Sequence, residues 1–219
     1  GSFANVCIYR LPKNKQIVSG RSFCPKCKKK IKWYDNLPLI SFIILNRKCR
    51  NCNKVIPARY FIVELITGIA FLLIYLNFKN LNTIIFLSIL VLILIIIFFI
   101  DLENFIIPDT LNFSIMGLAL FKNFLPNFNT SLIHEINQSI IGGMVGYISI
   151  WLIIYLYKTF KKIDGMGLGD AKLMAGIGLL FGWQSIPFVL FISSILGLIF
   201  VVPSLIKKQK NMRTEIPFG

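Results

Sequence analysis

Acidic residues and histidine are scarce in this 219-residue sequence. It holds nine Asp and Glu against 24 Lys and Arg, and a single histidine, His134, which has no companion metal ligand. Charged residues make up only 15% of the chain, 56% of it is hydrophobic, and its mean hydropathy is +0.73. So apolar a composition excludes an ordinary soluble domain. It predicts an all-α polytopic membrane protein.

Apolar runs of roughly 20 residues, the length that crosses a bilayer, divide the chain. The polar stretch 10–57 contains no such run, and residues 1–9 are too few to span. From residue 58 to 219 we predict a membrane helical bundle with about six spans. The expected spans are 58–77, 81–100, 109–125, 138–157, 170–183 and 185–206.

Positive charge is concentrated near the start of the chain. Fourteen of the 24 Lys and Arg lie between Arg10 and Arg59, where Asp35 is the only acid. Beside membrane spans, such a block indicates cytoplasmic orientation and contact with anionic lipid, and we favour this over a nucleic-acid surface. If the block is cytoplasmic, alternation of the spans brings Asp101 and Asp170 to that same membrane face.

Four cysteines in the polar stretch form two C-x2-C pairs, which are Cys24, Cys27, Cys49 and Cys52. Four thiolates at this spacing suit one tetrahedral zinc ion, whereas the alternative is disulfides or unrelated buried thiols. A cytoplasmic insert argues against disulfides, because thiols are kept reduced there. We therefore predict a structural zinc site with a closed ligand shell. The fifth cysteine, Cys7, is expected to be inert.

Two aspartates lie at the ends of apolar runs, Asp101 after 84–100 and Asp170 after a glycine-rich connection. Each alone reads as an ordinary boundary carboxylate or a helix cap. Two on one membrane face are what a general acid and general base need to activate water, so we predict that they are catalytic. Close approach would make the pair share a proton.

Other residues are assigned supporting roles. Gly167 and Gly169 would let the backbone pass close to an extended substrate, and their spacing is not that of a dinucleotide-binding loop. Asp109, after Pro108, competes with Asp101 for the catalytic role, but Pro-Asp-Thr is a natural helix start and predicts capping. Glu64 is interpreted as an interfacial acid paired with Arg59 or Arg10, or as support for the active or substrate site.

Two strings of the sequence together resemble a known family. IDLENFIIPD (100–109) and GMGLGDAKL (165–173) are similar to the GxGD-type membrane aspartyl proteases, and most closely to the type IV prepilin peptidases. The resemblance covers nearly the whole chain. It implies cleavage of the basic leader of a prepilin or pseudopilin at the cytoplasmic face of the bacterial inner membrane, with Asp101 and Asp170 as catalytic residues.

The resemblance also implies further features. Residues 1–9 resemble the cytoplasmic end of a first membrane helix, so we expect a chain trimmed at both ends. Many family members also N-methylate the new amino terminus with S-adenosylmethionine, and the four-cysteine insert is associated with that activity. Relatives commonly carry glycine where this chain has Arg47, and a long cation there would block a cofactor or substrate.

Two alternatives from other classes stay open at this point. A signal-peptide-peptidase-like or presenilin-like protease shares the GxGD element, but its partner aspartate would lie deeper within a helix and a four-cysteine insert would be unexpected. A non-enzymatic zinc-knuckle membrane protein, such as a small transporter or scaffold, would not explain paired aspartates on one face. The sequence does not determine the oligomeric state or the identity of the substrate.

Overall fold

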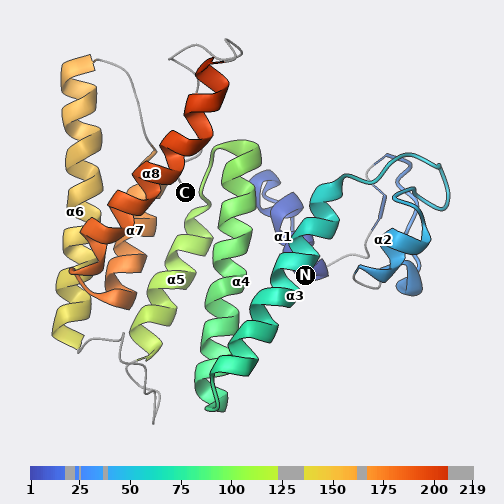
Figure 1. Cartoon of the computed structure of the whole chain (residues 1–219), viewed down its shortest axis with the longest axis horizontal. Helices are drawn as coiled ribbons and strands as arrows, with labels where there is room; N and C mark the ends of the chain where they lie inside the picture. Colours follow the sequence, from blue (N-terminus) through green and yellow to red (C-terminus); the bar gives the residue numbers. More distant parts are fainter. Residues whose placement is uncertain (18–22, 25, 37–38, 123–135, 162–166, 207–219) are drawn as a thin grey trace. The chain divides into compact units, whose positions relative to one another are not determined.

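The computed structural model describes residues 1–17, 23–24, 26–36, 39–122, 136–161 and 167–206, and helices dominate them (Figure 1). The longer helices are α1 (Ser2–Arg10), α3 (Ala58–Asn77), α4 (Leu81–Asn104), α5 (Asp109–Phe121), α6 (Ile136–Lys161), α7 (Leu168–Phe181) and α8 (Ser185–Ile206). The chain divides into two compact units, Gly1–Phe99 and Ile100–Gly219. The loop predicted around His134 lies outside the described residues.

In the first unit, α1 packs against α3 through fully buried apolar residues such as Ala4 and Val63. The insert between these helices holds only short elements, which are η1 (Leu11–Lys13), η2 (Trp33–Asn36) and α2 (Ile40–Ile44). No helix in its described part exceeds five residues. This is far shorter than the roughly 20 residues that a membrane span needs.

Within the residues that the structure describes, three helices are long and apolar enough to cross a membrane, namely Ala58–Asn77, Leu81–Asn104 and Ile136–Phe160. Pro57, in an extended conformation, precedes the first of them, and Ala58 and Asn77 are the predicted ends. The second runs four residues further than expected, because Asp101 and the polar residues after it remain helical. α5 has 13 residues and α7 has 14, which is less than the roughly 20 that a straight crossing needs. Length and composition therefore support three of the six predicted spans.

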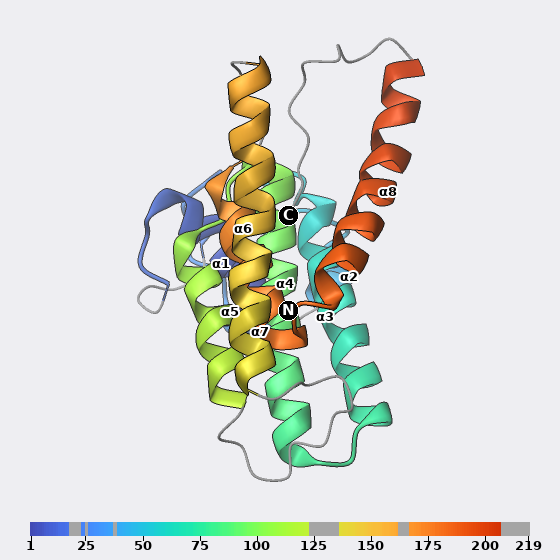
Figure 2. The same cartoon turned by 90° about the vertical axis from the view of Figure 1, so that its left-hand side faces the viewer.

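In the second unit, α7 is the central helix, with α6 and α5 packed against it (Figure 2). α6 and α7 cross so closely that a methyl group on Gly142 would collide with the backbone of Gly178 and Gly182. Glycine at these positions therefore allows α6 and α7 to pack closely within the chain. α8 joins through Ile186, which is buried with Ile150 of α6 and with residues of α7.

Candidate active site and metal centre

Asp101 lies in the last turn of α4 and is only 5% exposed. Its backbone carbonyl accepts the amide of Phe105 at 2.9 Å, and Phe105 has φ of 55°. A residue in the left-handed region at this position closes a helix, although glycine is usual there. The helix therefore ends at Asn104, three residues after Asp101 and not directly at it as predicted, and Asp101 lies in its last turn.

Asp170 lies in the first turn of α7, three residues after Gly167, whose backbone is extended. Asp170 is partly buried, whereas Gly167 is exposed. A Cβ on Gly167 would lie 3.8 Å from the Asp170 Oδ2 atom, so a longer side chain there would crowd the carboxylate. A Cβ on Gly169 would lie 3.1 Å from the Cβ of Ile107, so the start of α7 packs tightly against the connection between α4 and α5.

Asp101 and Asp170 belong to the same compact unit, and the charge of Asp101 acts on Asp170. They stand 69 positions apart in the sequence. Two carboxyl groups within reach of each other's charge do not ionise independently, so one holds its proton more tightly. A protonated and an ionised carboxyl side by side are a general acid and a general base.

The prediction that Asp109 caps a helix is wrong. The N-cap of α5 is Pro108, and no side chain makes a capping hydrogen bond there. Asp109 instead lies inside the first turn, and its Oδ1 accepts a hydrogen bond from Lys172 Nζ of α7 at 2.7 Å. An ion pair with a residue 63 positions away replaces the local cap because α5 and α7 are packed side by side.

Sequence reasoning missed Lys172 and Asn112. Asn112 is completely buried, and its Nδ2 donates to the carbonyl of Gly169, the residue before Asp170, at 3.2 Å. The sequence did carry a signal, since Asn112 follows Asp109 by three residues and so lies on the same face of the helix. Nothing in the sequence paired that face with the start of α7.

Glu64 belongs to the first unit. Its Oε1 accepts a hydrogen bond from the Ser2 hydroxyl at 2.6 Å, and its Oε2 accepts one from the Leu39 amide at 2.9 Å. Glu64 therefore links α1, α3 and the insert. Its suggested support of the active or substrate site stays a prediction.

The four cysteines of the insert form one cluster. All four Sγ atoms lie within 4.8 Å of one another, and tetrahedral zinc with bonds of about 2.3 Å places its sulfurs about 3.8 Å apart. The described part of the cluster is free of disulfides. The pKa of the Cys49 thiol is lowered to about 7, chiefly by a hydrogen bond from the Asn51 backbone, whereas that of the Cys52 thiol is raised to about 11. The thiols of the cluster therefore do not titrate independently.

Both C-x2-C pairs have the same local geometry. The carbonyl of the first cysteine accepts the amide four residues on, from Lys28 and Asn53, at 2.8 and 2.9 Å. Both of those residues have positive φ, of 57° and 52°. Each turn therefore presents two sulfurs to a common point, as the spacing predicted.

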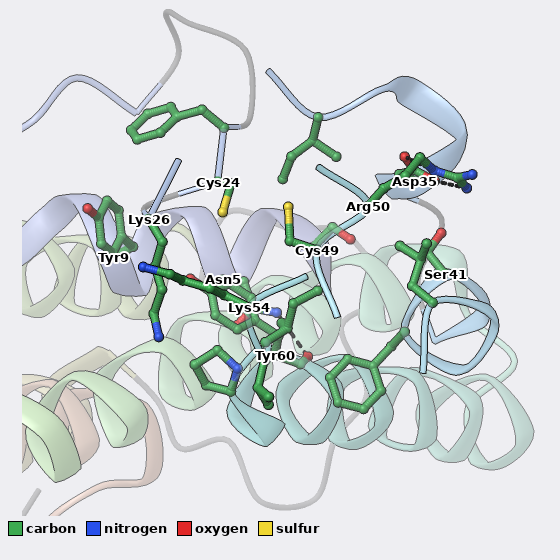
Figure 3. A pocket seen from close by; sticks show the side chains of 18 of the residues that line it. Asn5, Tyr9, Cys24, Lys26, Asp35, Ser41, Cys49, Arg50, Lys54 and Tyr60 are labelled. Carbon is green, nitrogen blue, oxygen red and sulfur yellow. Dashed lines mark hydrogen bonds and ion pairs between the residues drawn. The ribbon is translucent and has the colours of Figure 1, made fainter. Parts of the chain in front are cut away.

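A cavity of about 260 Å³ lies beside the cysteine cluster, between the insert and helices α1 and α3 (Figure 3). Its walls are mostly apolar and include Tyr9 and Tyr60, and Glu64 is among its polar lining residues. Arg47 is not among the lining residues, and its guanidinium lies 5.7 Å from the centre of the Phe42 ring. The expected obstruction by Arg47 therefore does not apply to this cavity.

Comparison with known proteins matches both parts of the chain. Residues 1–78 match the bacterial peptidase A24 N-terminal domain, and residues 88–202 match the type IV leader peptidase family. Proteins named prepilin leader peptidase/N-methyltransferase are similar over most of their length. That of Vibrio cholerae is 39% identical, covering 91% of this chain and 80% of the relative, and that of Klebsiella pneumoniae is 35% identical, covering 89% and 86%. No solved structure matches. These matches do not favour the signal-peptide-peptidase-like or the non-enzymatic alternative.

Proposed function

Because the chain belongs to the type IV leader peptidase family, we propose that Asp101 and Asp170 are the catalytic carboxyls with which this peptidase removes a prepilin or pseudopilin leader. The observation that carries the assignment is the placement of Asp170 within the field of the buried Asp101. Asp109 is a weaker candidate because its carboxylate is held by Lys172.

The chemistry follows from the two protonation states of the pair. The ionised carboxylate takes a proton from a water molecule as its oxygen attacks the scissile carbonyl, and the protonated carboxyl donates to the developing oxyanion. Collapse of the tetrahedral intermediate breaks the C–N bond, and the proton taken from water passes to the leaving amine. As the carbonyl re-forms, the hydroxyl made from the oxyanion returns its proton to the carboxylate that donated it, so the pair regains its starting protonation states.

The assignment is tested with three matched Asp→Asn variants of the full chain and a prepilin substrate. Asp101→Asn and Asp170→Asn should each lower the cleavage rate by about 10²-fold or more, because each removes one proton-transfer group. Asp109→Asn should keep most of the activity, because its carboxylate serves an ion pair. Substantial cleavage by a folded Asp101→Asn or Asp170→Asn variant would remove that residue from the pair.

Substrate access is assigned to the exposed start of α7. Gly167 is exposed and leaves room for an extended backbone beside Asp170, whereas the space beside Gly169 is occupied by Ile107. The insert and the expected leader are both basic, so leader binding relies on backbone pairing or local acids rather than on overall charge. The charge pattern supports a multi-pass protein of the bacterial inner membrane with this site at the cytoplasmic face.

For the first unit we propose a zinc ion held by Cys24, Cys27, Cys49 and Cys52, where it has a structural role. A ligand shell closed by four thiolates has no open position for a water molecule. The relatives' names include N-methyltransferase, and S-adenosylmethionine would supply the methyl group. The cavity residues Tyr9, Tyr60 and Glu64 suit this cofactor, because they offer aromatic faces to its base and a carboxylate to its sulfonium.

A further inference from the structure

We infer that Asn112 is a positioning residue for Asp170. The inference rests on the proposed function, because it matters only if Asp170 is catalytic. Asn112 is 0% exposed on a helix whose other fully buried residues are apolar, such as Ile115 and Ala119. A buried amide on an apolar helix face is unfavourable unless it is hydrogen-bonded.

The hydrogen bond that Asn112 makes is directed at the peptide adjoining Asp170. Its Nδ2 donates to the carbonyl oxygen of Gly169, and that carbonyl belongs to the peptide group that carries the Asp170 amide. Peptide groups are planar, so holding this oxygen fixes the direction in which the Asp170 backbone continues. Asn112 therefore controls where the Asp170 carboxyl points without touching it.

A second contact holds the same glycine from the side of the α4–α5 connection. Gly169 approaches Ile107 so closely that an added Cβ would lie 3.1 Å from the Ile107 Cβ and 3.4 Å from its carbonyl oxygen. Steric contact with Ile107 limits how far Gly169 can approach, and the Asn112 bond limits how far it can withdraw. A catalytic carboxyl displaced by about 1 Å can lose 10²-fold in rate.

The Oδ1 atom of the Asn112 amide indicates that packing alone does not require asparagine at this position. Its Oδ1 is buried and has no hydrogen-bond partner in the part of the chain that the structure describes. Leucine has nearly the same shape and carries no amide oxygen to leave unpaired. The Gly169 carbonyl loses its Asn112 donor, but it lies in the first turn of α7 and can accept the helical amide four residues on. If Asn112 served only to fill the contact between α5 and α7, leucine would fill it at least as well.

The test compares purified full-length wild type with Asn112→Leu and Asn112→Asp on a prepilin substrate. Asn112→Leu should keep the melting temperature and KM but lower kcat by about 10²-fold. Asn112→Asp should lose kcat at neutral pH and regain it, relative to wild type, as the pH falls, because a protonated carboxyl can again donate to Gly169. Taking the ratio to wild type removes the titration of Asp101 and Asp170.

Ser139→Ala is the matched control, because Ser139 is also buried with an unpartnered hydroxyl but lies on α6. It should leave both kcat and the pH profile unchanged. Full kcat in Asn112→Leu would overturn the inference while leaving the proposed function standing, provided that Asp170→Asn is inactive. If Asn112→Leu does not fold, the inference is tested by the ratio of kcat in Asn112→Asp to kcat in the wild type. A ratio that does not change with pH would also overturn the inference. Activity in Asp170→Asn would instead overturn the proposed function.

Discussion

Lys172 and Asp109 form a charged contact two residues from Asp170, yet they are poorly placed to contribute much stability. Their atoms approach to 2.7 Å, but the side chains are 29% and 57% exposed. Solvent screens a pair this exposed, and such pairs contribute roughly 0–1 kcal/mol. The contact is better understood as fixing how the start of α5 meets α7.

A double-mutant cycle should show how weak this coupling is. Asp109→Asn, Lys172→Met and the double variant should give an interaction energy below about 1 kcal/mol in thermal unfolding. High salt should reduce it further. A coupling of several kcal/mol would show that the pair is far less solvated than its exposure indicates.

Lys122 is the opposite case, because its charge is buried. It is 2% exposed, and its Nζ donates to the carbonyl of Leu180 at 2.7 Å and to that of Leu179 at 3.4 Å. These carbonyls lie in the last turn of α7, where helical partners are absent and the helix dipole favours a cation.

Replacing Lys122 with methionine should therefore destabilise the second unit. The methionine keeps most of the apolar stem but leaves the two carbonyls without their donor, which should cost about 1–3 kcal/mol. Thermal unfolding in detergent measures this, with Lys172→Met as the exposed-lysine control. An equal or higher melting temperature for Lys122→Met would mean that the cost of burying the charge exceeds its hydrogen bonds.

At the scale of elements, hydrophobic run length predicted α3 to its ends and placed α4 and α6. It carried α5 to residue 125, whereas the helix ends at Phe121, and it placed α7 two residues late, at 170–183 instead of Leu168–Phe181. An apolar run does not show where a helix begins or ends when the residues beside it are also apolar. Charge alternation predicted that Asp101 and Asp170 share a membrane face, and that stays a prediction. The contacts that hold the site did not, since Asn112 and Gly169 are 57 residues apart and nothing local pairs them.

The crossing of α6 and α7 depends on glycine at particular positions. A methyl group on Gly142 would collide with the Gly178 carbonyl, whereas one on Gly117 of α5 meets nothing within 4 Å. Gly142→Ala should destabilise the protein by about 1–3 kcal/mol through overpacking. The control Gly117→Ala should stabilise it by up to about 1 kcal/mol through helix propensity. Unfolding of both variants in detergent checks this, and equal effects would contradict the close crossing.

At the scale of the whole molecule, the proposed peptidase site and the proposed metal site belong to different compact units. Asp101 and Asp170 lie within Ile100–Gly219, and the cysteine cluster and its cavity lie within Gly1–Phe99. The second unit has a buried core of its own, centred on α7. The insert of the first unit has few regular elements, so we expect its order to depend on the proposed metal ion that would link its two cysteine turns.

Removal of the metal should consequently separate the two activities. Cys49→Ser, or treatment of the wild type with a strong chelator, should release one zinc per chain and make the insert sensitive to limited proteolysis. N-methylation should be lost, because the cavity is built partly from Cys24 and Cys49. Leader cleavage should fall only through poorer substrate presentation and stay above that of Asp101→Asn.

Cys7→Ala is the matched control, because Cys7 is buried in α1 and is not one of the four clustered cysteines. Wild type without zinc, together with unchanged proteolysis and methylation in Cys49→Ser, would contradict the metal site.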